Sequence, residues 1–126
     1  MKTIINSENA PAPIGPYSQA VLAGNTLFAS GQIAINPATG ELEMSTIEVE
    51  TEQVMQNIKA VLGEANMSFE NIVKCSIFLS SMNSFSRVNE VYGKYFPTNP
   101  PARETVEVSC LPKSVNVEIS FIAIDD

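Results

Sequence analysis

The sequence predicts one α+β domain, in which about six strands form a mixed β-sheet and two helices pack on one face. Two runs at the end of the chain alternate apolar and polar residues, which is the pattern of half-buried strands. Two longer stretches repeat apolar residues at helical spacing. No internal repeat or linker interrupts the 126 residues, so we expect a single domain over 1–126.

The chain is expected to begin with a rigid arm. Asn6 to Pro16 is rich in proline and glycine and cannot form a helix, so it delivers Tyr17 at its end. Tyr17 then either caps the core or belongs to a site. Two strands, 18–22 and 26–30, follow as a hairpin, and Gly31 marks either a bulge or a close approach of another group.

The first helix is expected to start at a capping box made by Ser45 and Glu48, after an exposed turn at 36–40. Asn66 suits its C-terminal end. The acidic residues of its first turns favour the positive end of the helix dipole, and we interpret them as a solvated face. Its apolar stripe is Val54, Ile58, Val61, Leu62 and Ala65.

A strand rich in β-branched and aromatic residues, 72–79, is expected in the interior of the sheet. Ser84 then caps a second helix, and the prolines after Phe96 stop it. The apolar stripe of this helix is Phe85, Val88, Val91, Tyr92, Tyr95 and Phe96.

The last quarter of the chain carries the candidate site. If its two alternating runs pair antiparallel about Leu111-Pro112, Arg103, Thr105 and Glu118 share the face opposite the core. Such a face is either a solvent-exposed ion pair or a binding site. Ile122 and Ile124 continue the face of Glu118, which favours a covered face and hence self-association.

Composition narrows the chemistry. The net charge of −7 argues against nucleic acid and anionic membrane partners, and no apolar run reaches the length of a membrane span. Because the chain has no histidine, histidine-based catalysis and nearly all zinc sites are excluded. Cys75 and Cys110 lie in strand-like runs without CxxC spacing, so we expect buried, reduced thiols and a cytoplasmic protein, without a signal peptide.

Three blocks of sequence resemble the Rid (YjgF) family of reactive-intermediate deaminases. They are Ala10-Pro-Ala-Pro-Ile-Gly-Pro-Tyr-Ser-Gln-Ala20, Ser30-Gly-Gln32, and Pro101-Ala-Arg103 with Val106-Glu-Val108, Leu111-Pro112 and Val117-Glu-Ile119. The resemblance runs from about Thr3 to Ile124 and is greatest to the RidA-type branch. It implies a chorismate-mutase-like fold and a homotrimer with sites between subunits.

The resemblance also implies a function. Rid proteins hydrolyse 2-imino and enamine acids, such as 2-iminobutanoate and 2-iminopropanoate, to 2-oxo acids and ammonia, without a cofactor or metal. Arg103 would hold the substrate carboxylate, assisted by the backbone N–H of Thr105, where many members have cysteine. Glu118 would orient and activate water.

The remaining family positions would line the substrate. Tyr17 would enclose it from the neighbouring subunit, and Gly31 would offer backbone groups to the imine or water. Asn89 matches a recurrent position that is either structural or substrate-binding. The alternative to an enzyme is a non-catalytic trimeric module that binds small carboxylates such as 2-oxo acids, and ribonuclease activity is disfavoured by charge and the absent histidine.

Overall fold

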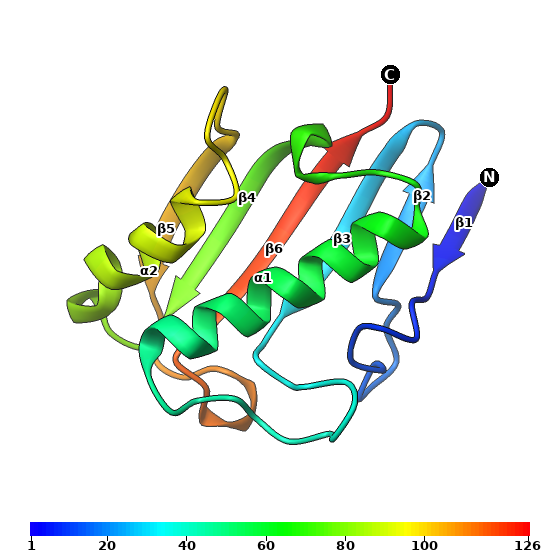
Figure 1. Ribbon diagram of the computed structural model, residues 1–126. Helices are drawn as coiled ribbons and strands as arrows, with labels where there is room; N and C mark the ends of the chain where they lie inside the picture. Colours follow the sequence, from blue (N-terminus) through cyan, green and yellow to red (C-terminus); the bar gives the residue numbers. More distant parts are fainter.

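A six-stranded mixed sheet carries both helices on one of its faces in the computed structural model, which describes residues 1–126 (Figure 1). The strand order is β1-β2-β3-β6-β4-β5. The elements are β1 Lys2–Ile5, β2 Ala20–Ala23, β3 Thr26–Gln32, α1 Ile47–Glu64, β4 Ile72–Leu79, α2 Phe85–Gly93, β5 Ala102–Glu107 and β6 Val117–Ile124. The predicted fold class, sheet size and helix placement are therefore confirmed, and β1 is a strand that the sequence patterns did not single out.

The core lies between the helices and one face of the sheet. Val54, Ile58 and Leu62 of α1 are fully buried, together with Ile77 of β4 and Ile119 of β6. Burying an aliphatic side chain of this size contributes roughly 1.5–3 kcal/mol to the stability of the fold. The apolar stripe predicted for α1 is thus the stripe that packs on the sheet. Neither helix has both the length and the apolar character needed to span a membrane.

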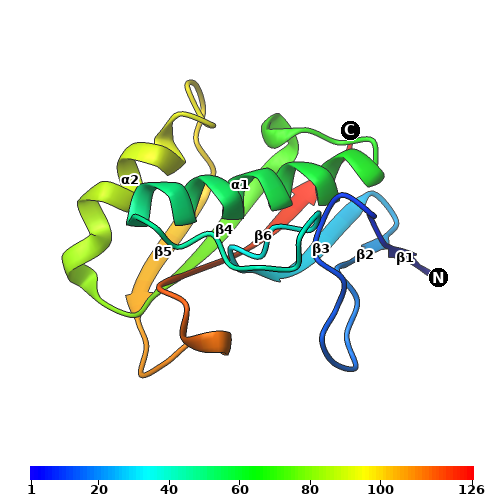
Figure 2. The ribbon, with the colours of Figure 1, turned by 60° about the horizontal axis from the view of Figure 1, so that its bottom comes forward.

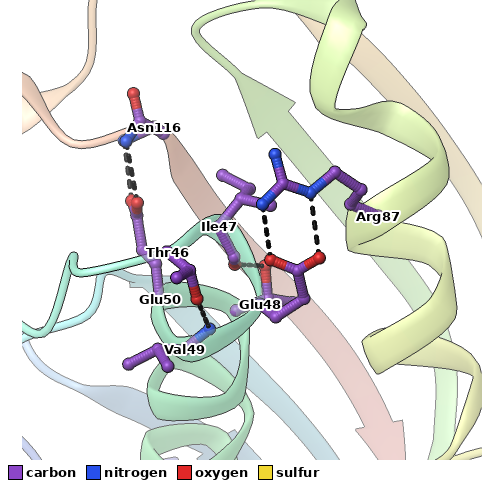
Figure 3. A network of polar contacts seen from close by, with 8 residues as sticks. Thr46, Ile47, Glu48, Val49, Glu50, Arg87 and Asn116 are labelled. Atoms are coloured by element: carbon purple, nitrogen blue, oxygen red, sulfur yellow. Dashed lines mark hydrogen bonds and ion pairs between the residues drawn. The ribbon is translucent and has the colours of Figure 1, made fainter.

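The ends of α1 refine the predicted boundaries. Thr46, and not Ser45, caps the helix, because its hydroxyl accepts the Val49 N–H at 3.1 Å (Figure 3). Glu48 has no part in a capping box. It pairs instead with the Arg87 guanidinium of α2 through two hydrogen bonds of 2.7 and 2.9 Å. Asn66, just after α1, adopts the left-handed conformation (φ 58°) that ends helices, as predicted.

The predicted pairing of the last two strands is wrong. β4 lies between β5 and β6: it pairs parallel with β5 and antiparallel with β6. The cause is the crossover through α2, which returns the chain so that β5 runs alongside β4 in the same direction. Residues 108–116 then pass the end of β4 to reach its other side.

This topology also corrects the shared face of the candidate residues. Arg103 is in register with Cys75 and Thr105 with Ile77, so both side chains lie on the helix-covered face. Glu118 is in register with Phe78 and lies on the opposite face, which no helix covers. We call this second face the open face.

The open face is partly apolar, as predicted from Ile122 and Ile124, which are half-buried on it. Ile4, Phe28 and Val106 add exposed apolar side chains. Figure 2 shows both helices on one side of the sheet, while the later part of the loop between β1 and β2 and the turn at Pro112–Ser114 project on the other. Monomeric proteins seldom expose a group of apolar side chains of this kind on one face of a sheet.

The two cysteines differ. Cys75 is buried beneath α2, as predicted, and burial raises the pKa of its thiol. Cys110 is exposed, which corrects the prediction of burial. The strand before it, β5, ends at Glu107, so Cys110 lies in the connection to β6 and on no sheet face.

Candidate functional site

Tyr17, Gly31 and Glu118 line one pocket, with a volume of about 450 Å³, where β3 ends and β6 begins. The arm, the end of β3 and the start of β6 therefore meet there, although they are distant in sequence. The other residues around the pocket are Pro11, Ala12, Ile14, Gln19, Ser30, Gln32, Ile33, Ile35 and Pro112. Its wall is mostly apolar, and Glu118 is its one carboxylate.

Gly31 is both a bulge residue and a point of close approach. The register of β3 against β6 shifts between Ala29 and Gln32, so β3 carries one extra residue here. The Glu118 side chain fills the space beside Gly31: a Cβ atom there would lie 2.0 Å from Glu118 Oε2. Any larger residue would displace the carboxylate.

Glu118 is half-buried, and desolvation raises the pKa of its carboxyl above the ordinary value of 4.5. No hydrogen bond or ion pair within the chain holds its carboxylate; the ion pairs of the chain join Lys74 to Glu104 and Arg87 to Glu48. A carboxylate that is partly dehydrated and uncommitted is suited to exchange protons with a bound water.

The arm that carries Tyr17 is fastened by Gln19, a residue that the sequence patterns did not single out. Its buried amide accepts the Ser7 N–H at 2.6 Å and donates to the carbonyls of Ser7 at 3.0 Å and Pro11 at 2.9 Å. Tyr17 itself is 47 % exposed, so it does not cap the core of this chain. A buried amide in a non-repeating segment gives no periodic signal, which is why no sequence pattern identifies Gln19.

Arg103 occupies a separate place, between β5 and α2. One of its guanidinium nitrogens donates to Asn89 Oδ1 at 2.5 Å, and the group lies 5.6 Å from the ring of Phe85 and 5.2 Å from that of Tyr92. These contacts fix the guanidinium and leave its remaining N–H groups without a carboxylate partner in the chain. Guanidinium N–H groups that are free in this way are the donors that carboxylates bind in proteins.

Two polar atoms near Arg103 lack partners. The hydroxyls of Tyr92 and Thr105 are buried without a hydrogen bond in the chain. Unpaired buried hydroxyls are uncommon in folded proteins. Asn89 contacts Arg103 through its side-chain oxygen, and both alternatives for its role, structural and substrate-binding, remain predictions.

The candidate residues therefore form two groups. The Glu118 group consists of Tyr17, Gly31 and Glu118, and the Arg103 group consists of Asn89, Arg103 and Thr105. The groups lie on opposite faces of the sheet, and β4 separates their strands. No three histidine, cysteine, aspartate or glutamate side chains lie close enough together to hold a metal ion.

Comparison with known proteins assigns the family. The family model described as Endoribonuclease L-PSP matches residues 7–125. A RutC family protein of Pyrococcus horikoshii is 53 % identical over 123 residues, which cover 98 % of each chain. The 2-iminobutanoate/2-iminopropanoate deaminase of Bos taurus is 44 % identical over 124 residues, covering 98 % of this chain and 90 % of the bovine protein.

Solved structures agree with this result. The crystal structure of TdcF of E. coli with bound serine superposes with a TM-score of 0.94 at 37 % identity, covering 98 % of this chain and 99 % of TdcF. Sequence and structure match over nearly the full length of the chain. The chain therefore belongs to the Endoribonuclease L-PSP family, which is the Rid or YjgF family whose motifs its sequence carries.

Proposed function

We propose that this protein is a hydrolase acting on C–N bonds that deaminates short 2-imino acids, such as 2-iminobutanoate and 2-iminopropanoate, to 2-oxo acids and ammonia. The observation that carries the proposal is the uncommitted Glu118 carboxylate, with its raised pKa, in the pocket lined by Tyr17 and Gly31. The 44 % identity to a deaminase of this name supports the same substrate class.

The complete site is proposed to lie between subunits. A short imino acid cannot reach both Arg103 and Glu118 of one chain, because they lie on opposite faces of the sheet with β4 between their strands. In a homotrimer, the Glu118 group of one subunit would face the Arg103 group of its neighbour. The exposed apolar side chains of the open face, Phe28 and Val106 among them, support such an assembly.

In this site Arg103 would bind the substrate carboxylate with two parallel hydrogen bonds, and the backbone N–H of Thr105 would add a third. Asn89, Phe85 and Tyr92 hold the guanidinium in place, so little entropy is lost on binding. Tyr17 would cover the bound imine.

Ionised Glu118 would take a proton from water as the water oxygen bonds to C2 of the imine, and would pass this proton to the imine nitrogen, which gives a carbinolamine. The carboxylate would then take the hydroxyl proton of the carbinolamine and pass it to the amine nitrogen as the C–N bond breaks. The 2-oxo acid and ammonia leave, and Glu118 is ionised again. Imines already hydrolyse in water, so orienting the water and the substrate needs to supply only about a few kcal/mol. None of these steps requires a metal or cofactor.

A second function, binding of small carboxylates without catalysis, is favoured by one observation. The Arg103 group is preformed and does not involve Glu118, and the TdcF relative binds serine. A ribonuclease function has less support, because the net charge is −7 and the chain contains no histidine.

The test is release of 2-oxobutanoate from the imine that threonine dehydratase produces, with and without this protein. We expect faster release with the wild type and none above background with Arg103→Ala or Glu118→Gln. If the wild type has no effect on several amino-acid-derived imines yet binds 2-oxobutanoate through Arg103, the binding function holds and the deaminase function is wrong.

A further inference from the structure

Glu50 is a fully buried carboxylate (0 % exposed) in the first turns of α1, although its sequence position suggested a solvated face. Its partners are N–H groups of Asn116, just before β6, and of Val117, the first residue of β6. Oε2 accepts the backbone N–H groups of Asn116 at 2.7 Å and Val117 at 3.0 Å, and Oε1 accepts the Asn116 side-chain amide at 2.8 Å (Figure 3). No lysine or arginine pairs with it.

These three bonds explain how a charge is tolerated inside the core. A buried carboxylate is costly unless its oxygens are satisfied, and here both are. The positive end of the α1 dipole adds support, because Glu50 is in the N-terminal part of the helix. Glu50 therefore does not form an ion pair, and its hydrogen bonds fix the backbone at Asn116 and Val117 to α1.

The segment that Glu50 holds is strained. Lys113 and Ser114 are consecutive non-glycine residues in the left-handed region, with φ of 55° and 57°. Such conformations cost free energy and persist only where the surroundings enforce them. Asn116 is fixed further by Ser80, whose N–H donates to its carbonyl at 3.0 Å and whose hydroxyl donates to its side chain at 3.1 Å.

Both ends of this segment belong to the pocket. Pro112, just before the strained pair, lines it, and Glu118 directly follows the anchored residues. Successive residues of a strand point to opposite faces, so a fixed Val117 N–H on the core side fixes the direction in which Glu118 leaves the sheet. Glu50 touches neither the pocket nor a substrate, and acts only through the backbone of β6.

We propose that Glu50 is a positioning residue that sets the place of the Glu118 carboxylate in the pocket. The expected effect on kcat rests on the proposed function. The expected effect on the position of the Glu118 carboxylate rests on the geometry alone. Substitution of a residue that serves only stability would lower the free energy of unfolding and leave kcat of the folded enzyme unchanged.

The experiment compares Glu50→Ala, Glu50→Asp and Glu50→Gln with a matched control, Ile58→Ala. Ile58 is fully buried in the same helix and makes no polar contact with the segment before β6. Glu50→Ala removes both acceptor oxygens and with them all three hydrogen bonds, and Glu50→Asp withdraws the oxygens by one methylene group. Glu50→Gln keeps one oxygen for the two backbone N–H groups, and a turned Asn116 amide can accept from its NH₂ group.

We expect kcat for imine hydrolysis to fall about tenfold or more in Glu50→Ala and Glu50→Asp, with KM nearly unchanged because Arg103 binds the substrate carboxylate. Glu50→Gln and Ile58→Ala should keep the wild-type kcat at a temperature where each variant is folded. The inference is overturned if folded Glu50→Ala has the wild-type kcat, or if Ile58→Ala loses as much. If Glu50→Ala does not fold, kcat of Glu50→Asp is compared with that of the wild type and of Ile58→Ala, with the same outcomes.

A second measurement does not depend on activity. NMR signals of the Glu118 backbone and carboxyl group should move in Glu50→Asp and Glu50→Ala but not in Ile58→Ala, and the Val117 N–H should exchange faster. An inactive wild type would contradict the proposed function while these signals still decide the role of Glu50. Unmoved Glu118 signals would contradict the positioning role itself.

Discussion

The carboxylate of Glu118 occupies the space where a side chain at Gly31 would begin, with Oε2 2.0 Å from the position of a Cβ atom. The Glu118 side chain is therefore the reason that position 31 needs a glycine. The backbone conformation is not the reason, because Gly31 lies outside the left-handed region. The two residues act as one feature of the pocket.

Gly31→Ala is expected to fold and to lose activity. The atoms that the new methyl group meets are at the end of a flexible side chain, so Glu118 swings away and the backbone stays. We expect kcat to fall about 100-fold, as for loss of the base itself, with a melting temperature close to that of the wild type. The matched control is Gly63→Ala in α1, where the added methyl group meets no atom within 4 Å apart from its chain neighbours and the backbone of its own helix.

Gly63→Ala should keep full activity and gain about 0.5–1 kcal/mol in the free energy of unfolding, since alanine favours a helix. Wild-type activity in Gly31→Ala would mean that the Glu118 carboxylate does not work from this position.

Arg103→Lys tests the guanidinium fork separately from the charge. Lysine keeps the charge but cannot donate to Asn89 and to a carboxylate at once in the planar geometry of arginine. We expect KM for the imine to rise about tenfold or more, with a smaller change in kcat. Arg87→Lys, at an exposed arginine paired with Glu48, should leave both constants unchanged. An equal loss in the two variants would contradict a specific role for Arg103.

The fold was predictable in its elements but not in their neighbours. The alternation of apolar and polar residues predicted the strand that begins at Val117, and it placed Arg103 and Glu118 on polar faces of their strands. A period of two, however, says only which residues of one strand share a face. Which strands pair depends on the α2 crossover, so the predicted hairpin placed Arg103 on the face of Glu118 and was wrong.

The burial of polar residues, like the pairing of the strands, was not predictable from the sequence. Glu50 lies in an acidic run that looks solvated, and Gln19 in a segment without period. Their burial depends on acceptors and donors supplied by residues far away in the chain, which no local pattern contains. Gly31 could be predicted because an isolated glycine at the end of a strand often marks a bulge or a close backbone approach.

Glu118→Gln and Glu104→Gln should change stability in opposite directions. The raised pKa of Glu118 means that the folded state binds its proton more tightly than the unfolded state does. Its contribution to stability is therefore present below the ordinary value of 4.5 and is lost as pH rises through the raised value. Glu118→Gln removes this loss, so its melting temperature should exceed that of the wild type increasingly as pH rises from about 4 to about 7.

Glu104 serves as the contrasting case. Hydrogen bonds from Ser76 and Lys74 lower the pKa of Glu104, so its contribution is present above 4.5 and is lost as pH falls through the lowered value. Glu104→Gln should thus melt below the wild-type temperature near neutral pH. Thermal denaturation at several pH values measures both, and a parallel shift of the two variants would contradict the assigned signs.

The separation of Arg103 from Glu118 leads to a complementation experiment. Arg103→Ala and Glu118→Gln damage different groups, so refolding the two variants together should create interfaces in which an intact Glu118 group faces an intact Arg103 group. Random assembly of a trimer gives about one quarter of the wild-type sites. Glu118→Gln mixed with Gly31→Ala is the control, because both changes damage the Glu118 group and no interface is then complete.

Native mass spectrometry establishes that mixed oligomers have formed in both samples. Activity that returns in the first mixture and not in the second requires that each site takes its groups from two chains, since neither variant chain is complete by itself. Mixed oligomers without any activity would instead mean that a site takes Arg103 and Glu118 from one chain, which would contradict their places on opposite faces of the sheet. The experiment therefore decides between a site shared by two chains and a site within one chain.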